Sequence, residues 1–133
     1  MFSGIEGGAQ RSEQSLPPAF VVEDDVMMLR LLSEVAAAAG LDPMAFTRLS
    51  SVRSALQHRK PALLLIDDDL PDGRGGDLVR ELRASPRTRD VKVLFCTSAA
   101  PGRRRELSRL APVVHKPFSL TDFERALSDL VGH

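Results

Sequence analysis

Residues 63–73 have the sequence LLLIDDDLPDG, in which an apolar run ends abruptly in three aspartates and a proline turn. A short apolar run bounded by turn residues is typical of a strand buried in a parallel sheet. We therefore expect Asp67 at the carboxyl end of that strand, the edge where open α/β sheets bind ligands. Carboxylates crowded at such an edge repel one another and lose solvation, so a cation or a reaction is expected to use them.

Length and composition limit the class of protein. The 133 residues predict one domain with a single core and no need of disulfides. The 18 basic and 18 acidic residues cancel, so no net field attracts nucleic acid or a membrane surface. No apolar stretch reaches the roughly 18 residues of a membrane span. The single cysteine, Cys96, and the lack of a signal-peptide pattern at the start favour a cytoplasmic protein.

Strand-like and helix-like segments alternate after a segment, 1–18, that is rich in Gly, Ser, Gln and Pro and is expected to be a flexible tail. The domain is expected to span 19–133. The expected strands are 19–22, 44–49, 63–67, 91–97 and 113–115. The expected helices are 26–39, 51–57, 76–84, 103–110 and one that Ser119 caps. This alternation predicts an α/β fold with a five-stranded parallel sheet and helices on both faces.

Polar side chains follow several of the expected strands. If the strand order is the flavodoxin-like 2-1-3-4-5, Glu23 and Asp24 after the first strand lie beside Asp67 after the third. Three such carboxylates match Mg²⁺, which is held by oxygen ligands and bridges to phosphate. Thr97 ends the fourth strand as a hydroxyl donor, and Lys116 follows the fifth as a compact cation. These are the parts needed for phosphoryl transfer, with Asp67 as the nucleophile.

From residue 19 to about residue 131, the chain resembles the receiver domain of two-component response regulators. The matching residues are Glu23-Asp24, Asp67 with Pro71 and Gly75, Thr97, and Lys116-Pro117-Phe118. The resemblance implies that Asp67 accepts a phosphoryl group from a histidine kinase or phosphotransfer protein. Glu23, Asp24, Asp67 and the backbone carbonyl of Asp69 would arrange Mg²⁺. Lys116 and Thr97 would contact the phosphoryl group, and the Lys116–Pro117 peptide would be cis.

The sequence also departs from the receiver pattern. Receivers usually carry Tyr or Phe three residues before the lysine, where this chain has Val113, and the segment 97–116 is a few residues short. Asp68 and Asp69 place two extra carboxylates beside the acceptor, where they are expected to modify its role. The run 103–105, three arginines, is interpreted as a solvated helix face rather than a docking site.

We therefore expect a phosphorylatable signalling switch of a phosphorelay, not an enzyme with a dedicated substrate. Because the chain ends straight after the last helix, it is expected to signal by protein contact, to an unidentified downstream protein or a second copy of itself. One alternative is a degenerate receiver that acts as a binding or dimerisation module without phosphorylation. A second is a phosphatase of the haloacid dehalogenase type with Asp67 and Asp69 as its paired acids, although Leu70-Pro71 do not fit that motif.

Overall fold

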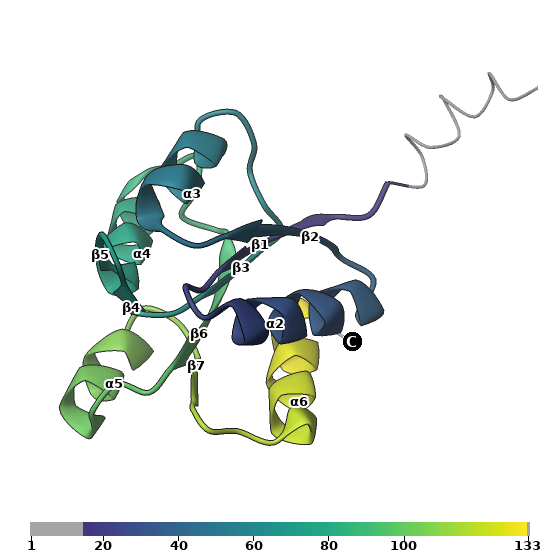
Figure 1. The fold of residues 1–133 in the computed structure, drawn as a ribbon. Coiled ribbons are helices and arrows are strands. Elements are labelled where there is room, and N and C mark those ends of the chain that lie inside the picture. The colour runs from purple at the N-terminus through teal and green to yellow at the C-terminus, as the bar shows by residue number, and fades with distance from the viewer. Residues whose placement is uncertain (1–14, 133) are drawn as a thin grey trace, which may run out of the picture.

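The computed structural model describes residues 15–132, which form a parallel sheet with helices on both faces (Figure 1). The five strands lie in the order β2-β1-β3-β6-β7. This order is the expected 2-1-3-4-5 when only the strands of this sheet are counted, so the predicted fold class is confirmed. Most of the expected flexible tail lies outside the described residues.

The strands of the sheet follow the apolar runs of the sequence. They are β1 (Pro18–Val22), β2 (Asp42–Phe46), β3 (Leu63–Ile66), β6 (Lys92–Thr97) and β7 (Val113–His115). All four residues of β3 are buried, because β3 is hydrogen-bonded between β1 and β6 and covered on both faces. The Leu-Leu-Leu-Ile run thus forms the centre of the sheet, and Asp67 follows at its carboxyl end.

Helices cover the two faces of the sheet in two groups (Figure 1). One group is α2 (Val26–Ala38) with α6 (Leu120–Val131), and the other is α3 (Leu49–Leu56), α4 (Gly75–Ala84) and α5 (Pro101–Ser108). The alternation of side chains along each strand divides the core between them. In β3, Leu63 and Leu65 pack toward the first group, whereas Leu64 and Ile66 pack toward the second.

Some boundaries differ from the expectations. The strand expected at 44–49 is β2, Asp42–Phe46, because Leu49 already begins α3. The helix expected at 103–110 is α5, which begins at Pro101, since proline suits the first helical turn. A two-stranded hairpin of β4 (Asp69–Leu70) and β5 (Gly73–Arg74) was not predicted, because strands of two residues are too short to show a period.

Within residues 15–132, none of the helices combines the length and the apolar character that crossing a bilayer requires.

Candidate active site

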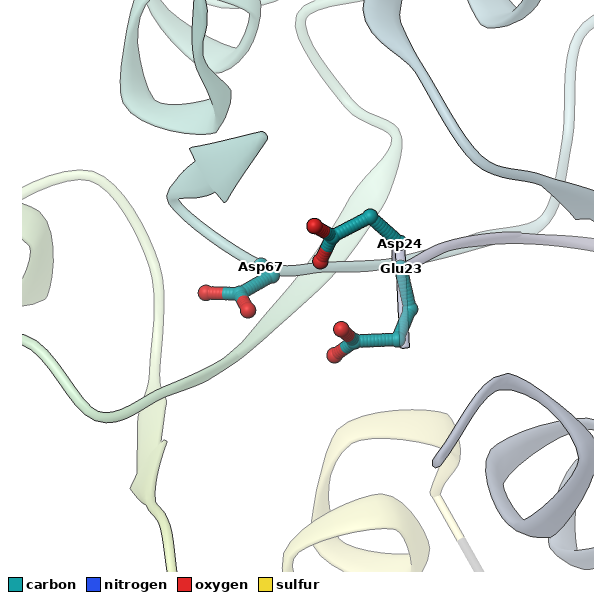
Figure 2. Close-up of side chains that lie close together, drawn as sticks. All are labelled: Glu23, Asp24 and Asp67. Carbon is teal, nitrogen blue, oxygen red and sulfur yellow. The ribbon is translucent and has the colours of Figure 1, made fainter. Parts of the chain in front are cut away.

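Three carboxylates meet at the carboxyl ends of β1 and β3, the neighbouring strands at which the chain reverses its direction of winding (Figure 2). Glu23 and Asp24 follow β1, and Asp67 follows β3; one carboxylate oxygen of each lies within 4.8 Å of the others. Glu23 and Asp67 are buried, at 1% and 7% exposure, whereas Asp24 is exposed to solvent. The structure therefore brings together the acidic residues that the sequence places at two separate strand ends.

A single cation joins two of these carboxylates. The Lys116 Nζ donates to Glu23 Oε1 at 2.6 Å and to Asp67 Oδ2 at 2.9 Å. Burial would lower the pKa of Lys116, but the hydrogen bonds to Glu23 and Asp67 outweigh it and raise that pKa. Burial raises the pKa of Glu23, although its hydrogen bond with Lys116 acts in the opposite direction. The ammonium thus compensates charge in a partly desolvated site.

Thr97 is connected to Lys116 through the backbone. The Lys116 N–H donates to the Thr97 carbonyl at 2.9 Å, and the Lys116–Pro117 peptide is cis, as the resemblance implies. The Thr97 side chain is buried, and its hydroxyl oxygen accepts a hydrogen bond from the Ala99 N–H at 3.2 Å. As an acceptor in that bond, the hydroxyl keeps its hydrogen for donation to a ligand oxygen.

Helix capping does not explain Glu23 and Asp24. The cap of α2 is the next residue, Asp25, whose Oδ1 accepts hydrogen bonds from the N–H groups of Met27 and Met28. Glu23 instead accepts from the Asp25 N–H and from Lys116. The capping function and the candidate site function therefore belong to different acids of the same run.

Asp68 points away from the cluster and forms a second buried ion pair. Its carboxylate accepts bonds from Arg103 Nε at 2.8 Å, Arg103 Nη2 at 2.9 Å and the Gly76 N–H at 2.9 Å. A longer bond of 3.3 Å comes from Arg74. Burial opposes ionisation of Asp68, but the bonds from Arg103 and Gly76 hold its pKa below the usual value. Asp68 is thus a structural carboxylate, and it also accepts a hydrogen bond from the first turn of α4.

Two glycines allow α4 to begin against this loop. The Gly75 N–H donates to the Asp68 carbonyl at 2.9 Å, and a Cβ on Gly75 would collide with the Asp67 carbonyl oxygen. A Cβ on Gly76 would lie 2.8 Å from Arg103 Nη2. Gly75, which the receiver resemblance includes, therefore has a steric reason for being glycine in this chain.

The other acids of the run have different surroundings. Asp72 accepts hydrogen bonds from the N–H groups of Leu49 and Ser50, and so caps α3 from a distant segment. These bonds lower the pKa of Asp72. The Asp69 side chain is exposed and lies outside the carboxylate cluster. The contribution expected of Asp69 is its backbone carbonyl, and that remains a prediction.

The family model of the response regulator receiver domain matches residues 19–128. The chain belongs to the receiver domain family. Receiver domains are phosphorylatable signalling switches of two-component systems rather than classical enzymes. This assignment fits a site composed of clustered acids, a threonine and a lysine at four strand ends.

Relatives with known names agree with the assignment. The chain is 31% identical to the response regulator receiver protein CpdR of Brucella abortus, over 84% of this chain and 93% of that protein. It is 35% identical over 83 residues to the phosphate regulon transcriptional regulatory protein PhoB of Rhizobium meliloti. That match covers 62% of this chain and only 37% of the length of PhoB.

Solved structures confirm the receiver fold. The receiver domain of the sensor histidine kinase PA1611 from Pseudomonas aeruginosa PAO1 superposes with a TM-score of 0.75 at 24% identity. The match covers 90% of this chain and all of that one, whose structure has a magnesium ion coordinated in the active site cleft. A CheY-like receiver domain from Methylobacillus flagellatus matches at 25% identity with a TM-score of 0.75, over 87% of this chain and 99% of its own.

The donor set of this receiver suits a hard divalent cation. Glu23, Asp24 and Asp67 offer carboxylate oxygens, the ligand type that Mg²⁺ prefers, and the exposed Asp24 leaves the cluster open to solvent on one side. The Lys116 ammonium already compensates two of these carboxylates, which shows that the cluster can accommodate positive charge. The residues present therefore fit a magnesium ion.

Sequence reasoning missed Arg103 in this receiver. The run 103–105 was expected to be a solvated helix face, but the Arg103 side chain is only 20% exposed and is bonded to Asp68. That expectation was wrong for Arg103 because α5 turns this residue inward, onto the side of the helix that carries the buried Leu107. The spacing of four residues between Arg103 and Leu107 is the sequence signal that could have shown it.

Proposed function

We propose that this receiver is a Mg²⁺-dependent phosphoryl switch in which Asp67 accepts the phosphoryl group of a histidine kinase or phosphotransfer protein. The observation that supports this role most strongly is the Lys116 ammonium, 2.9 Å from Asp67 Oδ2, beside the cluster of Glu23, Asp24 and Asp67. The carboxylate proposed as nucleophile therefore lies beside a cation and beside the acids proposed to hold the metal ion. Phosphoryl transfer depends mainly on such positioning and charge neutralisation.

In the proposed reaction, an Asp67 carboxylate oxygen attacks phosphorus while the bond from phosphorus to the donor breaks. With a phosphohistidine donor, the leaving imidazole nitrogen keeps the electron pair of the broken P–N bond, and the product is an acyl phosphate. Lys116 pairs with a phosphoryl oxygen, and the Thr97 hydroxyl donates to another. Mg²⁺, when bound by Glu23, Asp24, Asp67 and the Asp69 carbonyl, would neutralise phosphoryl charge. Attack by water returns Asp67 and inorganic phosphate.

The phosphorylated receiver then signals through protein contacts, to a downstream protein or to a second copy of itself. The receiver catalyses only its own phosphoryl gain and loss. The cytoplasmic location stays a prediction.

A second candidate function, a binding module that needs no phosphorylation, is favoured by one observation: Val113 stands in β7 where receivers usually carry an aromatic ring.

The test is to incubate the protein with Mg²⁺ and a small acyl-phosphate donor and to measure its mass. We expect a gain of one phosphoryl group that base removes, and no gain in Asp67→Asn. If the wild-type protein gains no phosphoryl group from the small donor or from kinases, the proposed phosphoryl switch is contradicted. The binding module that needs no phosphorylation then remains as the function. Release of phosphate from diverse phosphomonoesters over many turnovers would instead support the phosphatase alternative.

A further inference from the structure

The Asp68–Arg103 ion pair connects the acceptor loop to α5. The Arg103 guanidinium donates two nearly equal bonds, of 2.8 and 2.9 Å, to the two oxygens of Asp68. The Asp68 side chain is 2% exposed and that of Arg103 is 20% exposed. Bidentate bonds of this kind fix the direction of the guanidinium as well as its distance. The N-terminal half of α5 is therefore attached to the residue that directly follows Asp67.

On the side toward α4, the ion pair is closely packed. Arg103 and Leu107 lie on one side of α5, four residues apart, and both face the first turn of α4. A Cβ on Gly76 would lie 2.8 Å from both Arg103 Nη2 and Leu107 Cδ2. The Gly76 N–H also donates to Asp68 Oδ1. Because the bidentate bonds and this contact with α4 hold the two groups together, a displacement of Asp68 is expected to move the guanidinium.

The same helix has a second connection to the site. Thr97 ends β6, and three residues separate it from Pro101, where α5 begins. Thr97, Asp68 and Arg103 all line one cavity of about 370 Å³ beside the acceptor loop. Thr97, which ends the strand before α5, and Arg103, which lies in α5, therefore line the same cavity.

Phosphorylation changes the charge that the Arg103 guanidinium experiences. An acyl phosphate on Asp67 replaces the single negative charge of the carboxylate with roughly two negative charges on the phosphoryl group, one residue away from Asp68. That dianion attracts the guanidinium and repels the Asp68 carboxylate, so the interaction free energy of the pair differs between the two states of Asp67. Such a difference is what a ligand or modification needs in order to shift a conformational equilibrium.

Resting on the proposed function, we propose that Arg103 is a positioning residue that transmits phosphorylation of Asp67 to α5. Arg103 acts through Asp68 and connects the acceptor loop to α5. This connection lies on the same side of the sheet as Val113, which has no aromatic ring. Arg103 takes no part in the chemistry at phosphorus. Its loss is therefore expected to separate phosphorylation from the response of α5.

The test compares hydrogen exchange of residues 101–108 before and after treatment with Mg²⁺ and a small acyl-phosphate donor. In the wild type we expect exchange in α5 to change about threefold or more on phosphorylation. Arg103→Met is expected to gain the phosphoryl group while its α5 exchange stays constant. Arg103→Lys keeps the positive charge but cannot donate two parallel bonds as a guanidinium does, and it is expected to restore part of the response. Arg105→Met, the same change on the exposed side of α5, is the matched control and keeps the full response.

Mass measured on the same samples separates the two hypotheses. A wild type that gains no phosphoryl group contradicts the proposed function and this inference with it. A phosphorylated wild type with unchanged α5 exchange, or a phosphorylated Arg103→Met that responds like the wild type, overturns the inference alone. If circular dichroism shows Arg103→Met to be unfolded, Asp68→Asn takes its place, because it keeps the shape of the side chain and an acceptor for the Gly76 N–H. The same loss of response is expected of it.

Discussion

Asp67 and Asp68 are adjacent in sequence and both buried, yet their surroundings differ. Asp68 accepts four hydrogen bonds, two of them from one guanidinium and one from a helix N-terminus. Asp67 shares the Lys116 ammonium with Glu23 and accepts one longer backbone bond of 3.3 Å from Asp69. Because successive side chains at a strand end point to opposite sides, the two carboxylates enter different environments.

The hydrogen-bond partners of each carboxylate determine whether it is structural or reactive. The Asp68 carboxylate accepts its hydrogen bonds from donors within the fold, two of them arginine side chains, so its charge is compensated there. Asp67 lies among other carboxylates with one shared cation, which leaves unbalanced negative charge beside it. A metal ion or a phosphoryl group can respond to that imbalance.

Asp68→Ala tests the structural role of Asp68. Removing one partner of a buried ion pair is expected to lower the free energy of unfolding by about 3 kcal/mol. The value lies toward the lower end of the usual range because the 20% exposed Arg103 can reach solvent. Denaturant titrations measure the change. Asp69→Ala, the neighbouring change at an exposed side chain, is the control and should cost less than about 0.5 kcal/mol. Equal costs for the two variants would contradict the structural role.

Lys116→Met tests the proposed reactivity of Asp67. Without the ammonium, the initial rate of phosphoryl gain from a small donor should fall about a hundredfold, since a preorganised charge at the transferring group is lost. Lys92→Met, an exposed lysine at the start of β6, is the matched control and should keep the wild-type rate. Mass measured over time gives both rates. An Lys116→Met protein as fast as the Lys92→Met protein would remove Lys116 from the proposed mechanism.

The glycine beside the ion pair offers a milder perturbation. Gly76→Ala places a Cβ against the guanidinium of Arg103, which must shift, and we expect a loss of about 1–2 kcal/mol of unfolding free energy. Combining Gly76→Ala with Asp68→Ala in a double-mutant cycle should give a loss smaller than the sum, because both act on Arg103. Additive losses would show that Gly76 and Asp68 act independently.

Acid titration of the folded protein tests the ionised state of Asp68. The pKa of Asp68 is lower in the folded state than in the unfolded chain, so its stabilising contribution is present above the ordinary aspartate pKa of about 3.9. That contribution is lost as the pH falls through the folded-state pKa. Asp68→Asn should therefore show a shallower decline of stability below about pH 4 than the wild type. An unchanged acid dependence would contradict the ionised state of Asp68.

Much of the fold could be predicted, because it depends on patterns local to the sequence. The LLLI run identified the central strand, and the acids, Thr97 and Lys116 at strand ends identified the residues that the structure brings together. Parallel strands place their carboxyl ends at one edge, so placing the strands also places these residues.

Side-chain partners in three dimensions could not be predicted in the same way. The Asp68–Arg103 pair spans 35 residues, and the Asp72 cap of α3 spans 22 and 23 residues. Residues 103–105 are three identical arginines, and they differ only in the direction in which their side chains leave α5. That direction depends on how α5 packs, which charge alone does not reveal.

The central claim, that Asp67 is the phosphoryl acceptor and Asp68 a structural carboxylate, is tested most directly by one paired measurement. Asp67→Asn and Asp68→Asn are treated side by side with Mg²⁺ and a small acyl-phosphate donor, and the mass of each intact protein is compared with the wild type. We predict no phosphoryl group on Asp67→Asn and one on Asp68→Asn. A phosphoryl group on Asp67→Asn, or its absence from a folded Asp68→Asn, would contradict this assignment.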